Sequence, residues 1–247
     1  MTTAINTTII CAIWHQDSKK ETLLDEHAKN ISKLTNKVSP IYVFENGDVP
    51  PKWLEGHKIT SSLPLTIYEA WNLALAATRT RYVMNLNLDD RLYFDAVGLL
   101  EETAQKENAA LIGGDWKVCY SQRETNCLRD CYPASDLPFV PGWPPRAGTN
   151  TRLGSGTGHR NSFGPATMWS MECHLKSPRY PYRTTDGQKI LSVADAVWWS
   201  YLHHQLGLKL VRIPKIIGNY FSHPDSQAEF RSANEIEQIA SKQISLI

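Results

Sequence analysis

Four short apolar runs stand out along the first 113 residues of the chain. They are rich in β-branched and aromatic side chains and lie at 8–14 (TIICAIW), 41–44 (IYVF), 82–88 (YVMNLNL) and 109–113 (AALIG). Runs of this length without polar alternation are typical of strands buried on both faces of a parallel sheet. The pattern therefore predicts four buried strands.

Amphipathic stretches separate these runs and predict helices at 18–38, 66–78 and 95–106. The apolar side chains of the second stretch share one helix face: Ile67, Ala70, Trp71 and Ala74. Alternating strands and helices predict an α/β fold, a single Rossmann-like domain with a mostly parallel central sheet and helices on both faces.

Three of the predicted strands are followed directly by polar or aromatic residues. Trp14 and His15 follow the first strand, 45–48 (ENGD) follows the second, and Asp89 and Asp90 follow the third. Right-handed crossovers bring the carboxyl ends of parallel strands to one edge of the sheet, where ligands bind. We therefore expect these residues to converge at that edge.

The second half of the chain has a different pattern. Residues 115–160 are rich in Pro, Gly, Arg and Asn, which predicts a long irregular loop or lid. A helix is predicted at 192–206, a strand at 209–213 that ends at Pro214, and a surface helix in the polar tail from Ser226.

Asp89 and Asp90 are two adjacent carboxylates after a buried strand. Like charges side by side disfavour ionisation, and a divalent cation relieves the repulsion. Mn²⁺ and Mg²⁺ accept carboxylate oxygens and keep positions for diphosphate oxygens. The pair therefore indicates a metal–diphosphate site, although a solvated pair or a helix cap would need the same residues.

Two segments carry a family resemblance. Residues 66–75 (TIYEAWNLAL) and 82–91 (YVMNLNLDDR) resemble the donor-site half of family-2 glycosyltransferases with the GT-A fold, whose Asp-x-Asp motif has an Asn-x-Asp-Asp-Arg variant. The resemblance implies that Asp90 binds the metal, that Asp89 holds the ribose, and that Glu45 reads the nucleotide base. Asn72 and Arg91 lie in the matched segments, and the resemblance implies that they also bind the nucleotide-sugar donor.

The remaining donor-side candidate is Trp14, which follows the first strand at the same predicted edge. On the acceptor side, residues 163–169 (FGPATMW) resemble a strand that lines the acceptor in these enzymes. The acceptor-side candidates are aromatic or small residues: Phe163, Gly164, Trp169 and Trp198.

The same resemblance implies a base and a further metal ligand. Residues 194–199 (ADAVWW) resemble the helix-opening motif that supplies the catalytic base, here Asp195, with Ala194 where an acid often precedes it. Residues 220–224 (YFSHP) fall where a histidine, here His223, often reaches the metal or diphosphate.

These matches imply one glycosyltransferase domain over 1–247, with a nucleotide-sugar-binding half at 1–114, the loop 115–160 and an acceptor-side half at 161–247. The expected reaction moves a sugar from a nucleotide-sugar donor, UDP favoured, to a glycan or other hydroxyl acceptor. It uses Mn²⁺ or Mg²⁺, and attack opposite the leaving group predicts inversion. Asp195 would act as general base.

Three alternatives stay open. A nucleotidyltransferase would need a Gly-rich basic loop after the first strand, and residues 14–17 (WHQD) do not supply one. A non-catalytic sugar-nucleotide binding module is favoured by Ala194. A nucleic-acid acceptor is suggested by residues 142–183, which carry six Lys or Arg and one acid.

Composition adds limits on the compartment. The net charge of +1 gives no support for a whole-protein polyanion binder, and five cysteines without a CxxC pair indicate reduced thiols. No apolar run approaches the roughly 20 residues of a membrane helix. No basic stretch followed by an apolar core marks a secretion signal. The expected location is cytoplasmic, or peripheral at a membrane surface.

Overall fold

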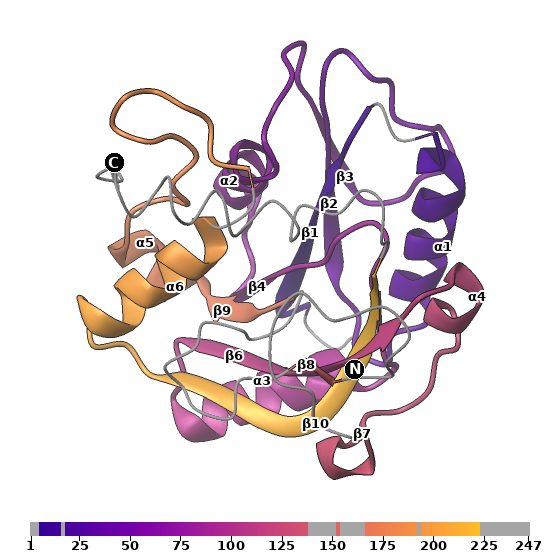
Figure 1. Ribbon diagram of the computed structural model, residues 1–247, viewed down its shortest axis with the longest axis vertical. Helices are drawn as coiled ribbons and strands as arrows, with labels where there is room; N and C mark the ends of the chain where they lie inside the picture. The colour runs from indigo at the N-terminus through magenta and orange to yellow at the C-terminus, as the bar shows by residue number, and fades with distance from the viewer. Residues whose placement is uncertain (1–4, 16–17, 138–151, 154–165, 192–193, 223–247) are drawn as a thin grey trace.

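The computed structural model describes five stretches of the chain: 5–15, 18–137, 152–153, 166–191 and 194–222. They form a mixed α/β structure around one sheet with the strand order β3-β2-β1-β4-β9-β6-β10-β5 (Figure 1).

The first four strands in this order are parallel. They are β3 (His57–Thr60), β2 (Ser39–Phe44), β1 (Thr7–Ile13) and β4 (Tyr82–Asn85). The sequence pattern did not predict β3, because this edge strand is short and largely exposed and so has no apolar run.

The other half of the sheet is mixed. β9 (Met168–Ser170) runs antiparallel between β4 and β6 (Leu111–Cys119), and β10 (Leu210–Phe221) is parallel to β6. Three two-residue strands pair antiparallel with β10 or β6: β5 (Arg91–Leu92), β7 (Tyr132–Pro133) and β8 (Arg152–Leu153). The longest ladders are parallel, which confirms the predicted fold class.

Helices cover both faces of the sheet (Figure 1). One face packs on α1 (Lys20–Ser32) and α3 (Ala96–Glu107); the other packs on α2 (Ile67–Ala77), α5 (Met171–Lys176) and α6 (Ala194–His204). Short turns of helix follow at α4 (Gln122–Thr125) and η1 (Ala134–Asp136). In the described part of the chain, every helix is too short or too polar to cross a membrane.

β1 shows how one strand serves both layers. Successive side chains of a strand point to opposite faces. Ile9 and Ile13 therefore pack towards α1 and α3, whereas Ile10 packs towards α2 and α6. Because both faces of this central strand are buried, its sequence is continuously apolar.

Two strands are longer than predicted. β6 extends through Trp116 to Cys119, into the segment expected to be irregular, because its side chains stay buried against both layers. β10 continues past Pro214, and its pairing with β6 shifts between Ile213 and Ile216. Proline has no N–H for the ladder, and a bulge of this kind lets the strand continue. The predicted tail helix lies outside the described residues.

The buried imidazole of His27 predicts a specific loss of stability in acid. His27 lies on α1, with its ring edge against the ring of Tyr42 at 5.7 Å between centroids. Burial, with a smaller contribution from the charge of Arg91, lowers the pKa of His27 to about 3. In the unfolded chain this pKa is about 6.5. Between these two values only the unfolded chain takes up the proton, so the free energy of unfolding falls as the pH falls.

The contribution of His27 approaches about 1.4 kcal/mol per pH unit within that window. We expect His27→Gln to remove this part of the pH slope, as measured by urea unfolding of both proteins at pH 7, 5.5 and 4.5. Carboxylates affect both proteins alike, so equal slopes in the two proteins would contradict the prediction.

Candidate functional site

The carboxyl ends of β1, β2 and β4 meet at one edge of the sheet. β1 lies between the other two, with Ile13 opposite Phe44 and Ile10 opposite Asn85. Neighbouring strands are about 4.8 Å apart, so the residues that follow the three strands are close in space. These are the residues around His15, Glu45 and Asp89.

Glu45 joins the end of β1 to the loop before α2. Its Oε1 accepts hydrogen bonds from His15 Nδ1 (2.9 Å) and from the His15 backbone N–H (3.4 Å). Its Oε2 accepts the backbone N–H of Leu65 at 2.6 Å. A carboxylate has about four acceptor positions, so room for one further donor is left. Trp14, beside His15, is 59% exposed.

The turn after β4 carries the two aspartates. Its first residue, Leu86, still donates its N–H to Ile10 O at 3.1 Å, and the Asp90 N–H then donates to Asn87 O at 3.2 Å. The side chain of Asp90 is fully buried, and its Oδ1 accepts the Phe221 N–H at 3.2 Å. Asp89 is half-buried. The loop is therefore tied both to β1 and to the end of β10.

The charge of this turn affects the pKa of the Cys11 thiol on β1. Burial raises the pKa of Cys11, and the nearby carboxylates of Asp89 and Asp90 raise it further. The charges of both aspartates therefore act on the central strand.

The chemistry of this turn fits a hard divalent cation. Among the described residues, no group of three or more His, Cys, Asp or Glu gathers at the distances of a complete metal cage. Mg²⁺-like ions are commonly held by one or two carboxylates together with substrate phosphates and water. Asp89 and Asp90 would provide the protein share of such a set. His223, expected as a further ligand, lies outside the described residues.

Arg91 does not point to the surface where a donor would bind. It is 1% exposed, and its guanidinium donates to Leu88 O (2.8 Å), Asp90 O (2.7 Å), Asn126 Oδ1 (2.9 Å) and Glu26 Oε2 (3.0 Å). The resemblance implied a donor contact, and the structure corrects this: Arg91 lies beneath the turn.

Asn72 is likewise turned towards the protein. Its Nδ2 donates to Tyr180 O at 3.0 Å, and its Oδ1 accepts the Tyr180 N–H at 3.1 Å. This two-way pair ties α2 to the chain between α5 and α6. The amide expected to contact the donor is therefore engaged with the backbone of Tyr180.

Asp195 lies in the first turn of α6, and its Oδ1 accepts a hydrogen bond from the Tyr68 hydroxyl at 3.4 Å. Tyr68 is in the first turn of α2, which starts at the same edge as the ends of the parallel strands. The negative charge of Asp195 adds to burial in raising the pKa of Tyr180. Asp195 is therefore placed at the edge of the sheet that carries Glu45.

The two tryptophans expected on the acceptor side belong to the core. Trp169 is 1% exposed on β9, and Trp198 is 0% exposed on α6, with its Nε1 donating to Pro178 O at 2.8 Å. They pack against each other at 5.6 Å between ring centroids. Neither ring can stack on a sugar in this arrangement. Phe163 and Gly164 lie outside the described residues.

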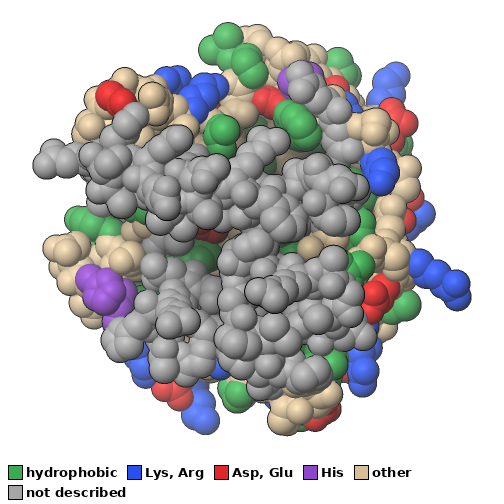
Figure 2. Space-filling model, viewed as in Figure 1, with side chains coloured by type: hydrophobic (Ala, Val, Ile, Leu, Met, Phe, Trp, Pro, Cys, Tyr) green, Lys and Arg blue, Asp and Glu red, His purple; other side chains and the backbone are tan. Residues whose placement is uncertain are grey.

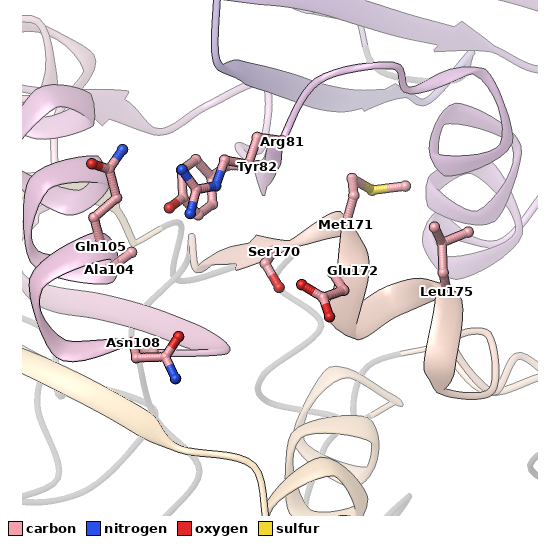
Figure 3. A pocket seen from close by; sticks show the side chains of 10 residues that line it. Arg81, Tyr82, Ala104, Gln105, Asn108, Ser170, Met171, Glu172 and Leu175 are labelled. Carbon is pink, nitrogen blue, oxygen red and sulfur yellow. The ribbon is translucent and has the colours of Figure 1, made fainter.

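Two cavities formed by described residues lie away from the carboxyl edge. One, of about 340 Å³, lies beside Tyr82 at the start of β4 and is bounded by the end of α3 and the start of α5 (Figure 3). The other, of about 570 Å³, lies between α1, β2 and the loop that precedes β3. Neither cavity therefore lies where the three strand ends meet.

Figure 2 shows charged side chains of both signs mixed around the rim of one face of the molecule.

Sequence reasoning missed several polar residues that shape the edge. They are His15 as a partner of Glu45, Tyr68 within the matched segment 66–75, Asn219 just before residues 220–224, and Glu26 and Asn126 in segments expected to be amphipathic or irregular. The detectable signal was weak, since a polar residue on a helix is usually solvated.

The paired amide of Asn72 makes a prediction that separates a structural role from a donor contact. Asn72→Ala leaves the backbone N–H and C=O of Tyr180 without their side-chain partner. We expect the free energy of unfolding in urea to fall by about 1–3 kcal/mol. An unchanged free energy of unfolding, together with weakened nucleotide binding, would instead support the donor contact.

Comparisons with known proteins identify the fold. No protein-family model matches the sequence, and no curated protein matches it. Among solved structures, residues 1–349 of S. aureus TarS match with a TM-score of 0.58 at 9% identity, covering 98% of this chain and 67% of that one. The mannosyltransferase PcManGT from Pyrobaculum calidifontis, in complex with GDP-Man and Mn²⁺, matches with a TM-score of 0.57 at 11% identity. The match covers 96% of this chain and 62% of that one.

Glucosyl-3-phosphoglycerate synthase from Mycobacterium tuberculosis, in complex with Mn²⁺, UDP and glucosyl-3-phosphoglycerate, matches at a TM-score of 0.52 and 12% identity. The match covers 96% of this chain and 78% of that one. The chain spans 41% of a longer TarS structure. These similarities show that the chain has the fold of the GT-A glycosyltransferases.

Proposed function

We propose that this protein transfers a sugar from a nucleoside-diphosphate donor, UDP favoured, to an acceptor hydroxyl, with Mn²⁺ or Mg²⁺ bound at Asp90. The observation that carries the proposal is the position of the Asp89–Asp90 turn at the carboxyl edge of a GT-A sheet, the same edge that carries Glu45. Solved neighbours in complex with UDP, UDP-GlcNAc or GDP-Man support the donor class.

The donor would lie across the ends of β1, β2 and β4. Glu45, held by His15 and Leu65, keeps an acceptor position for a base N–H. The exposed ring of Trp14 offers a surface on which the base or ribose can pack. Asp89, half-buried beside Asp90, would accept hydrogen bonds from the ribose hydroxyls. A bound divalent cation would offset the negative charge that develops on the leaving diphosphate.

Asp195 is the proposed general base. The hydrogen bond from the Tyr68 hydroxyl orients the carboxylate. An acceptor hydroxyl would pass its proton to Asp195 as its oxygen attacks the anomeric carbon from the side opposite the diphosphate. This single displacement gives inversion.

Two of the alternatives keep a distinct test. Ala194, at the position where an acid often precedes the base, is buried in the core at the start of α6, which favours the non-catalytic binding module. In that case donor binding would occur without turnover. A nucleic-acid acceptor would make transfer fall steeply with salt, because its phosphates release bound cations. A neutral glycan acceptor would be nearly indifferent to salt.

Asp90→Asn should abolish the metal-dependent part of donor binding, because it removes one anionic oxygen ligand while keeping the size of the side chain. The measurement is calorimetric binding of UDP, GDP and dTDP, each with Mn²⁺ and with chelator, to the wild type and the variant. Lys176→Gln, which breaks only an exposed ion pair with Glu172, is the control. Equal Mn²⁺-dependent affinity in both variants would remove Asp90 from the metal site.

Asp195→Asn should retain donor affinity and lose transfer by roughly 10²-fold or more, the usual contribution of a general base. Donor hydrolysis or transfer is measured by the amount of nucleoside diphosphate released. A variant with wild-type turnover would refute the base assignment. Loss of donor binding as well would mean that Asp195 supports the structure of the edge.

A further inference from the structure

The Asp89–Asp90 turn rests on a network of buried and partly buried polar side chains that the proposed chemistry does not use. We define the Arg91 network by its members: Glu26, Arg91, Gln122 and Asn126, with Asn219 attached through the backbone of 125–127 and Tyr93 attached through Asn219.

Arg91 holds the turn by its backbone. Its Nη1 donates to the carbonyl of Leu88 on one side of the aspartates and to the carbonyl of Asp90 on the other. A guanidinium is a rigid planar fork, so the two carbonyls are held at a fixed separation. One side chain therefore bonds the backbone of the turn at two points.

The remaining guanidinium contacts anchor that fork to two other elements. Nη2 pairs with Glu26 on α1, which also accepts a hydrogen bond from Gln122 Nε2, and Nε donates to Asn126 just after α4. Burial lowers the pKa of Arg91, and Glu26 opposes this most strongly among the neighbouring charges. Replacing a buried ion pair by apolar packing is often neutral or stabilising, so stability alone is a weak reason to keep this one.

The segment 125–127, which Arg91 contacts, is also hydrogen-bonded to β10. Asn219 is fully buried; its Nδ2 donates to Thr125 O (2.9 Å) and Cys127 O (3.1 Å), and its Oδ1 accepts the Tyr93 hydroxyl (2.8 Å). Two residues later, the N–H of Phe221 donates to Asp90 Oδ1. Asn219 therefore fixes the strand end that orients the Asp90 carboxylate.

From these contacts we infer that Arg91 and Asn219 are coupled positioning residues for the Asp89–Asp90 site: Arg91 sets the backbone of the turn, and Asn219 sets the donor to the Asp90 carboxylate. Neither touches the donor. The inference rests on the proposed function for the ligand, a divalent cation with a nucleoside diphosphate, but the ordering of the turn can be measured without any ligand.

The test uses Arg91→Lys, which keeps the positive charge but loses the fork. We expect the Mn²⁺-dependent affinity for UDP to fall roughly 10-fold, as for other residues that support metal ligands, with little change in binding in the presence of chelator. Amide hydrogen exchange at 86–90 should become faster in the variant without ligand. Asn126→Ala, which removes one of the four hydrogen bonds, is a milder variant, and we expect a smaller effect in the same direction.

The matched control is Arg212→Lys on β10. Arg212 forms a two-pronged pair with the buried carboxylate of Asp115 near the start of β10, so its loss tests the general effect of breaking a buried arginine pair. We expect Arg212→Lys to leave both the Mn²⁺-dependent affinity and the exchange at 86–90 unchanged.

The coupling is tested by combining Arg91→Lys with Asn219→Ala. Because Arg91 and Asn219 both bond the segment 125–127, the two changes disturb the same contacts. Their effects on exchange at 86–90 should therefore not multiply as independent changes would. Unchanged exchange in Arg91→Lys, or strictly independent effects in the double variant, would overturn the inference. If wild-type protein binds no nucleotide with Mn²⁺, the proposed function and the ligand named here fail together, and exchange still decides the positioning roles.

Discussion

Parallel pairing of β1 with β2 on one side and β4 on the other is the constraint on which the site depends. It requires both faces of β1 to be covered, and α1 with α3 and α2 with α6 provide that cover. Each crossover then returns the chain to the same side, so three strand ends open at one edge. The residues there are polar because the chain must turn, and close together because the strands are paired.

That edge is crowded with buried polar groups, and each needs partners inside the protein. Glu45 takes N–H groups from β1 and from the loop before α2, and Asp90 takes one from the end of β10. The same contacts that satisfy these carboxylates fix their orientation. A site for a cation and a diphosphate needs such fixed oxygens, since binding then costs little further ordering. Stability and function therefore depend on one set of hydrogen bonds.

Much of the fold could be predicted from the sequence because its signals are local. The continuous apolar run of β1 and the shared apolar face of α2 need no knowledge of the rest of the chain. β3 and the extension of β10 past Pro214 could not be predicted in this way. Each is permitted by its neighbours: β3 by its pairing with β2, and β10 by a shift of register against β6.

For the candidate site, sequence could indicate which residues lie near the edge but not which way they point. Asn72 and Arg91 stand in the matched segments, yet both side chains turn inward, because the backbone of Tyr180 and the carbonyls of the Asp89–Asp90 turn need their donors. Direction is decided by partners a hundred residues away or by the burial of a neighbouring turn. A motif can therefore persist because it builds the site, even where one of its residues never meets the substrate. On this argument, substitution of Arg91 would change the affinity for the metal and nucleotide through the shape of the turn. Substitution of Asp90 would change it by removing the carboxylate proposed to bind the metal.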